Sequence, residues 1–409
     1  MAAEYRGVEY LRKKLELKRR RVLERYGFYE MKNFVYDFGI STPPDVRFWN
    51  SCVGWCAKSV DSLADRLVFR EFSDDNFNIN EIYRMNYPAV LFDSAILSAL
   101  IGSCSFLYIT EDGGGIPRIQ VIDGANATGI IDPITMFLRE GYAVLERDDK
   151  GNATVEAYLN PEATYIFRSG VKEVEAIANR SGYTLLVPVI YRPDAVRPFG
   201  RSRISRANMN LVGSALRTIK RSEVAAEFYS FPQKYVTGLS DSAEIDKWRA
   251  TMSSLITFTK DEDGDKPVVG QFQQQSMTPH VEQLKMFASL FAGENGLTLD
   301  DMGFPMDNPS SAEAIKSAHE NLRLTARKAQ RTFEIGFLNA GFVAACLRDG
   351  MAYDRRELYN TAGKWEPIFE PDAAALSLIG DGAIKINQAI PGFFDKESLH
   401  DMTGIKGKQ

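Results

Sequence analysis

The chain is organised around a segment that begins Gly296-Leu-Thr-Leu-Asp-Asp-Met-Gly-Phe-Pro-Met-Asp-Asn-Pro-Ser310 and continues to Arg348. Its glycines and prolines interrupt helical hydrogen bonding, so the first part is predicted to be a loop. Ser310 or Ser311 can then cap a helix that has Glu313 in its first turn. The segment therefore predicts a loop that leads directly into a helix.

Apolar side chains recur every three or four residues after this loop, which predicts one long helix over 313–349. The stripe consists of Ile315, Ala318, Leu322, Ala326, Ala329, Phe333, Phe337, Ala340, Val343 and Leu347. At 1.5 Å per residue this helix would be roughly 55 Å long. It needs neighbours along its whole length, either from the same chain or from copies of it. We expect any bend at Gly336 or Gly341.

The composition is that of an ordinary globular protein with room for two or three domains. The chain has 409 residues, of which 44% are hydrophobic and 25% are charged. A net charge of −5 gives no overall nucleic-acid signature. Any contact with DNA must therefore be confined to a local patch, or must run along a surface that does not bind DNA tightly.

The cysteines and the hydropathy pattern point to a soluble protein of intracellular origin. The four cysteines show no disulfide-framework spacing, which is typical of a reducing compartment. Cys52 and Cys56 are four residues apart, and we interpret them as small core residues and not as metal ligands. No signal peptide and no apolar run of eighteen residues is visible, so no membrane partner is expected.

Residues 1–200 predict an α+β domain. A basic first helix either presents a solvated face or binds an anionic partner, and the sequence leaves both open. Helices are predicted at about 43–72 and 79–101. Antiparallel strands are predicted around 104–110, 118–122, 141–147, 154–159, 163–168 and 187–191.

Residues after 200 predict a small α/β module between two helices that leave the domain and return to it. The outgoing helix spans about 202–231 and the returning helix about 279–291. Between them lie a strand at 234–238, a helix at 242–255, an acidic loop at 260–266 and a strand at 267–273. An extended segment at 365–371 and a short helical tail at 372–404 follow the long helix.

The sequence contains no convincing catalytic or metal-binding motif. No Gly-x-x-x-x-Gly-Lys-Ser/Thr loop is present, and His280, His319 and His400 are far apart. The acidic loop 260–266 resembles a calcium loop, but Lys266 stands where glycine is required. The alternative that this loop weakly binds a cation at the surface stays open. We expect no cofactor, no resident metal and no enzymatic activity.

Four patterns occur in an order that resembles the portal proteins, or head–tail connectors, of tailed double-stranded-DNA bacteriophages. The similarity covers roughly residues 25–405. The patterns are Asn50-Ser-Cys-Val-Gly-Trp-Cys-Ala-Lys-Ser-Val-Asp-Ser-Leu-Ala-Asp-Arg-Leu67, Leu97-Ser-Ala-Leu-Ile-Gly-Ser-Cys-Ser-Phe-Leu-Tyr-Ile109, Phe199-Gly-Arg-Ser-Arg-Ile204 with Glu227-Phe-Tyr-Ser-Phe-Pro-Gln-Lys234, and Trp365 to Ile405.

The resemblance implies a mainly helical α+β subunit of a ring that usually has twelve copies and has DNA passing through its centre. It implies a wing at 1–200, a first stem helix at 201–231, a clip at 232–278, a second stem helix at 279–295, a tunnel loop at 296–312, a long wing helix at 313–349, a wing return at 350–371 and a short crown or tail at 372–409.

The resemblance also implies the location and the partners of the ring. The ring would be assembled in the host cytoplasm and would sit at one capsid vertex of the virion. DNA would enter through it during packaging and leave during ejection. The implied partners are non-specific double-stranded DNA, the terminase large subunit, a head–tail adaptor, and the major capsid and scaffolding proteins.

The implied mechanism is physical, because DNA that must slide should not meet a continuous basic lining. The tunnel loop fits, since it has no Lys or Arg; its DNA-facing candidates are Asp300, Asp301, Met302, Phe304, Met306 and Asp307. The basic stem candidates, which face either DNA or the next subunit, are Arg206, Arg217, Lys220 and Arg221. The partner-binding candidates in the clip are Asp261, Glu262, Asp263 and Asp265.

Three alternatives compete with this interpretation. The tunnel-loop segment can be an ordinary acidic surface loop. The chain can be a metal-dependent nucleic-acid enzyme that uses the scattered Asp123, Asp132 and Asp148. It can also be a binding adaptor that stays monomeric.

Overall fold

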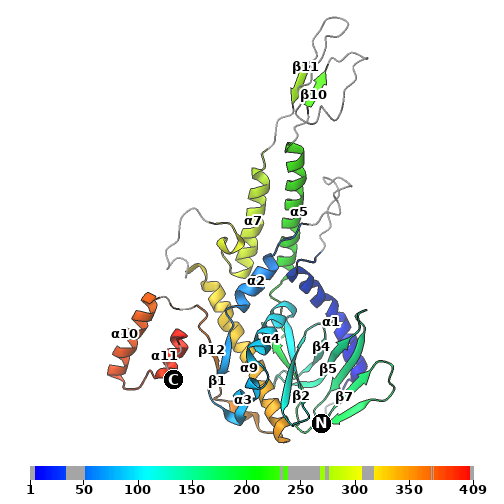
Figure 1. Ribbon diagram of the computed structural model, residues 1–409, viewed down its shortest axis with the longest axis vertical. Coiled ribbons are helices and arrows are strands. Elements are labelled where there is room, and N and C mark those ends of the chain that lie inside the picture. The colour runs from blue at the N-terminus through cyan, green and yellow to red at the C-terminus, as the bar shows by residue number, and fades with distance from the viewer. Residues whose placement is uncertain are drawn as a thin grey trace.

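The computed structural model describes residues 5–33, 51–230, 234–237, 268–271, 276–305, 317–369, 371 and 373–405. Two helices, α5 (Arg206–Ser230) and α7 (Thr278–Asn295), project side by side from a larger body (Figure 1). The strands β10 (Lys234–Thr237) and β11 (Val268–Gln271) lie beyond the far ends of these helices. The helices α10 (Ala373–Ala389) and α11 (Lys396–Thr403) lie beside the body. The prediction of a mainly helical α+β chain is confirmed.

The body is built around the helix α9 (Glu320–Asp349). Its predicted apolar stripe is confirmed from Leu322 to Leu347, where every predicted member is buried, whereas the predicted member Ala318 is exposed. The predicted start of the helix is not tested, because residues 306–316 lie outside the described residues. Residues 317 and 318 are helical, but His319 takes φ −93° and ψ 6° and interrupts the hydrogen-bond ladder. The continuous helix is therefore 30 residues long and shorter than predicted.

The two glycines of α9 serve close packing. A Cβ on Gly336 would lie 3.1 Å from the carbonyl oxygen of Pro188, and one on Gly341 would lie 2.4 Å from Cγ2 of Ile79. Both glycines lie inside the continuous helix. They let it approach a strand and a second helix more closely than any side chain would allow.

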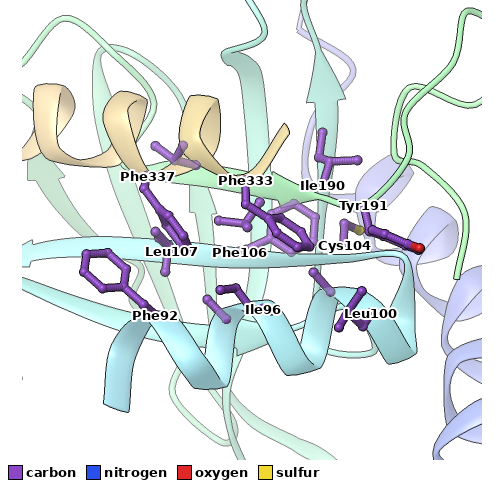
Figure 2. Close-up of a cluster of buried hydrophobic side chains, with 14 of the residues drawn as sticks. Phe92, Ile96, Leu100, Cys104, Phe106, Leu107, Ile190, Tyr191, Phe333 and Phe337 are labelled. Atoms are coloured by element: carbon purple, nitrogen blue, oxygen red, sulfur yellow. The ribbon is translucent and has the colours of Figure 1, made fainter. Parts of the chain in front are cut away.

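A three-stranded antiparallel sheet lies between α9 and the helix α4 (Pro88–Gly102). Its order is β3 (Pro117–Asp123), β2 (Cys104–Glu111), β9 (Leu186–Ile190). Figure 2 shows Phe333 and Phe337 of α9 above the central strand and Phe92, Ile96 and Leu100 of α4 below it. Because both faces of the sheet are covered, residues 104–109 of β2 are all buried, and the hydroxyl of Ser105 among them donates to the carbonyl oxygen of Ala95 at 2.7 Å.

A second, five-stranded antiparallel sheet carries the helix α1 (Val8–Tyr29). Its order along the sheet follows the chain: β4 (Ala127–Ile131), β5 (Leu138–Arg147), β6 (Ala153–Leu159), β7 (Ala163–Arg168), β8 (Glu175–Ala178). Leu11 and Leu15 of α1 pack on Tyr142, Val144 and Tyr158. The strands β4 and β8 were not predicted. β8 is exposed along its whole length and so carries no burial alternation.

Two predicted helices are shorter than expected. The helix predicted at 43–72 is described only from residue 51, and α2 (Trp55–Ala64) gives way to the strand β1 (Phe69–Phe72). β1 pairs with β12 (Gly363–Trp365), which overlaps the predicted extended segment 365–371 only at Trp365. The helix predicted at 79–101 is divided into α3 (Ile79–Arg84) and α4, because Tyr87 has φ 51° and precedes Pro88. A residue before proline is disfavoured in the helical region.

Short 3₁₀ turns complete the body: η2 (Asn76–Asn78), η3 (Asp300–Met302) and η4 (Arg355–Leu358). Within the described ranges, no single helix has the length and apolar composition to cross a membrane. The bent pair formed by residues 76–84 and 88–102, at 92° to each other, meets those criteria by length and composition alone.

Candidate functional site

The paired helices α5 and α7, here called the arm, are held together by an apolar seam with polar contacts along it. Val212, Ala215 and Leu216 of α5 are buried, as are Ala288 and Phe291 of α7. The hydroxyl of Thr218 hydrogen bonds to Oε1 of Gln283 at 3.0 Å. The outgoing and returning helices predicted from the sequence therefore do pack side by side.

A buried polar network, here called the arm base, fixes the arm to the body. It consists of Ser59 on α2, Arg203 before α5, Asn208 on α5 and Asn295 at the end of α7, and all four side chains are buried. Arg203 donates from Nε to the carbonyl oxygen of Ser59 at 3.2 Å and from Nη2 to that of Asn295 at 2.7 Å. The hydroxyl of Ser59 donates to Oδ1 of Asn295 at 2.8 Å.

The two asparagines close the network by pairing with each other. Nδ2 of Asn208 donates to Oδ1 of Asn295 at 2.9 Å, and Nδ2 of Asn295 donates back to Oδ1 of Asn208 at 3.1 Å. Burial lowers the pKa of Arg203, because desolvation disfavours the charged guanidinium. The hydrogen bonds to carbonyl oxygens offset this cost, so each member depends on the others.

The loop after α7 folds back onto the body. Gly296 ends α7 in the left-handed conformation with φ 64°, and Leu297 is buried. Met302 is 7% exposed and belongs to the core, and Phe304 is half-buried against it. Within the subunit, apolar burial therefore holds Met302 inward, against the prediction that it faces DNA, while the prediction for the half-buried Phe304 stays untested. The candidates Met306 and Asp307 lie outside the described residues.

The adjacent carboxylates of this loop have different roles. Asp301 accepts hydrogen bonds through Oδ2 from the backbone N–H and the hydroxyl of Thr298, both at 2.9 Å. Nδ1 of His319 lies 3.8 Å from the same oxygen. Asp301 therefore holds the turn, while Asp300 is exposed. Of the two, Asp300 is the more exposed.

The basic candidates on α5 do not form one exposed stripe. Arg206 is exposed, and Arg217 and Arg221 are half-buried. Lys220 is 8% exposed, because α5 turns this position inward, and its predicted contact with either DNA or the next subunit stays a prediction. Sequence spacing alone did not distinguish these orientations.

The module at the far end of the arm is described only as a strand pair. β10 and β11 are antiparallel, with Lys234 opposite Gln271 and Thr237 opposite Val268. The predicted partner-binding candidates Asp261, Glu262, Asp263 and Asp265 lie outside the described residues.

The carboxylates of the enzyme hypothesis lie in three separate turns. Asp123 accepts from the N–H of Ala125, and Asp132 from that of Ile134. The N–H of Ile134 lowers the pKa of Asp132, and the side chain of Asn152 lowers that of Asp148. Among the described residues, no group of three or more His, Cys, Asp or Glu side chains is placed to hold a metal ion. These aspartates stabilise turns.

Two curated proteins, both named portal protein, are similar to this chain in sequence. That of Mycobacterium phage D29 is 23% identical over 321 residues, and that of Mycobacterium phage L5 is 22% identical over 324 residues. Each alignment covers 72% of this chain and 65% of the relative, so the chain spans less than two thirds of either relative's length. These relatives confirm the sequence resemblance. No protein-family model matches the chain.

Solved structures with a similar outline come from a gene transfer agent, abbreviated GTA. The neck of the native GTA particle, computed with C12 symmetry, gives a TM-score of 0.46 at 12% identity and covers 95% of this chain and 100% of that chain. The virion of the native particle gives a TM-score of 0.45 at 12% identity, with the same coverage of both chains.

Proposed function

We propose that this chain is a portal protein, a subunit of the ring through which a tailed phage packages and ejects its DNA. The observation that carries the proposal is the sequence similarity to two portal proteins over 72% of the chain. The arm supports it, because two packed helices that carry a separate module away from the body suit a stem that ends in a docking surface. The role is structural and needs no catalysis.

The subunit would divide as the sequence predicted. The body with α1 to α4 and both sheets would be the wing, and α9 would be the long wing helix. The arm would be the stem, with the β10–β11 module as the clip. The loop at 296–312 would face the channel, and α10 and α11 would form the short crown. The ring would hold about twelve copies at one vertex of the virion.

Assembly is the first expected result. Purified chain at micromolar concentration should give rings with a central hole in negative-stain images, and a light-scattering mass of many chains. Head-to-tail contacts that close on themselves give every copy the same two neighbours. A mass of one chain, about 46 kDa, across protein concentrations and salt conditions would instead favour the monomeric adaptor.

Asp300→Lys is expected to increase the affinity of rings for double-stranded DNA and its dependence on salt. Each new phosphate contact steepens the plot of log affinity against log salt by about 0.9. The matched control is Asp149→Lys, the same charge change at an exposed turn of the five-stranded sheet. Equal salt slopes in the two variants would place Asp300 away from the DNA path. Asp301 is unsuitable for this test, because it holds the turn.

The module between the arm helices would dock the terminase motor during packaging and a head–tail adaptor afterwards. Its acidic segment and its place beyond the arm support this role. Asp261→Lys combined with Asp263→Lys should weaken binding of the motor while rings still form. Motor binding at wild-type strength in a pull-down would remove this segment from the interface.

A further inference from the structure

The helix α10 is apolar, yet much of its surface is exposed. Leu378 is 73% exposed and Ile384 is 60% exposed, and Ala383, at 7%, is the one buried side chain among those described on this helix. This helix has 17 residues, and most of the stability of a helix in a protein comes from packing of its apolar face. It therefore needs a partner that covers these side chains.

The arrangement of residues around α10 indicates two partners. At 3.6 residues per turn, Gly380 and Ile384 lie on one flank, and Leu378, Gly382 and Ile386 lie on nearly the opposite flank. The two flanks are separated on one side by the inward face, which contains Ala383. On the other side they are separated by an outward polar strip. The polar strip consists of Ser377, Asp381, Lys385 and Gln388.

The glycines point to close contact on both flanks. A Cβ on Gly380 or on Gly382 would meet nothing within 4 Å in the subunit. Glycine destabilises an exposed helix relative to alanine, and no contact within the described residues explains either one. A second helix backbone that approaches each flank explains both.

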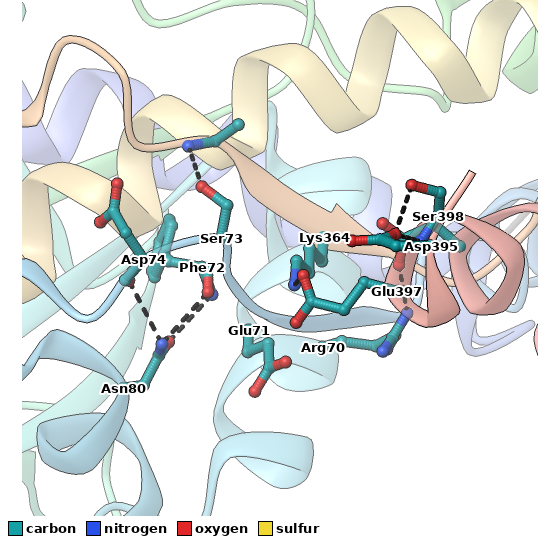
Figure 3. A network of polar contacts seen from close by, with 12 residues as sticks. Arg70, Glu71, Phe72, Ser73, Asp74, Asn80, Lys364, Asp395, Glu397 and Ser398 are labelled. Carbon is teal, nitrogen blue, oxygen red and sulfur yellow. Dashed lines mark hydrogen bonds and ion pairs between the residues drawn. The ribbon is translucent and has the colours of Figure 1, made fainter. Parts of the chain in front are cut away.

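The adjoining helix fixes α10 in place beside the body. Arg70 of β1 pairs with Asp401 of α11 at 2.9 Å, and Lys364 of β12 pairs with Glu397 at 3.1 Å. Figure 3 shows Arg70 and Lys364 next to Glu397. Asn387 of α10 exchanges two hydrogen bonds with the backbone of Phe394, both at 2.8 Å, which sets the turn between the two helices.

We propose that α10 is a contact between copies of this chain, in which the Gly380 flank of one copy packs on the Gly382 flank of the next. Two different flanks require a head-to-tail contact. With α10 along the ring axis, Gly380 of one copy and Gly382 of the next differ in height by only about 3 Å, which is two residues of helix, so the two glycines meet. The inference rests on the proposed ring and names a surface that closes it.

Crosslinking distinguishes this contact from any other. In a Cys52→Ser background, the double variant Gly380→Cys/Gly382→Cys should form disulfide-linked ladders beyond the dimer under mild oxidation. Cys56, Cys104 and Cys346 are buried and should not contribute. Gly380→Cys alone and Gly382→Cys alone should remain uncrosslinked, because neither position meets itself. Dimers from either single variant, or no ladder from the double variant, would overturn the proposal.

Blocking one flank gives a second measurement. Gly380→Leu fits the open space of an isolated subunit but should raise the concentration at which half of the chains are in rings by at least tenfold. The control Asp381→Leu adds the same side chain to the polar strip and should leave that concentration unchanged. Rings of equal stability in both variants would contradict this contact and leave the ring itself standing. A wild-type chain that forms no ring would overturn the proposed function as well.

Discussion

Arg203→Met is expected to lower the free energy of unfolding by about 2–4 kcal/mol. The variant removes the donors that satisfy the carbonyl oxygens of Ser59 and Asn295, which lie 3.2 Å and 2.7 Å from the guanidinium nitrogens. Methionine can fill much of the space but donates no hydrogen bond. Two buried carbonyl oxygens then each lose a charged donor, and the arm loses one of its contacts with α2, while the hydrogen bond from Ser59 to Asn295 remains. Urea unfolding monitored by tryptophan fluorescence measures the change.

The matched control lies two residues earlier. Arg201 is exposed and pairs with Asp194 at 2.7 Å, so Arg201→Met should cost about 0–1 kcal/mol. Limited proteolysis adds a local readout, since cleavage at the base of α5 should accelerate in the Arg203 variant alone. Equal losses of stability in the two variants would mean that burial of Arg203 contributes nothing.

Gly200→Ala is expected to lower the free energy of unfolding by a comparable amount or more, about 3 kcal/mol at least. A Cβ at this position would lie 2.1 Å from the carbonyl oxygen of Tyr191, which is a backbone atom and cannot rotate away. Gly200 also has φ 74°, where an L side chain is strained. The turn must open, and that displaces Arg203 three residues later. Thermal unfolding with a circular dichroism readout measures the effect.

Gly151→Ala separates the collision from the backbone strain. Gly151 has φ 81°, close to that of Gly200, but its Cβ would meet nothing within 4 Å. This control should therefore lose only the strain component, about 1–2 kcal/mol. If Gly200→Ala unfolds no more readily than Gly151→Ala, the close approach to Tyr191 is relieved at little cost.

Patterns that burial imposes on neighbouring residues were predictable from the sequence. The α9 stripe was found because one helix face is buried along its length. β2 was predicted from an alternating pattern, although both of its faces are covered. The break between α3 and α4 was missed, although Pro88 was visible, because the apolar period continues through Tyr87. The strand β8 has no buried face, so it carries no period to find.

The site was less predictable, because its members come from distant segments. Nothing in the sequence distinguishes Arg203, which is buried, from Arg201, which is exposed two residues away. Ser59, Asn208 and Asn295 meet only after α2, α5 and α7 pack. Met302 looked available to DNA because glycine and proline surround it, yet the turn held by Asp301 directs it inward. The division into a clip, a tunnel loop and a crown stays a prediction.

The two attachments of the body's projections differ in their electrostatics, and this has a consequence for ionic strength. Within the described residues, the arm base joins one cation to neutral amides, a hydroxyl and carbonyl oxygens, all buried from counterions. The α11 attachment depends on ion pairs in which Asp401 and Glu397 are exposed to solvent. Concentrated salt screens exposed pairs and hardly affects buried ones. A rise in ionic strength would therefore loosen the attachment of α10 and α11, while the arm keeps its direction relative to the body. Salt would thus act on one projection of the subunit and not on the other.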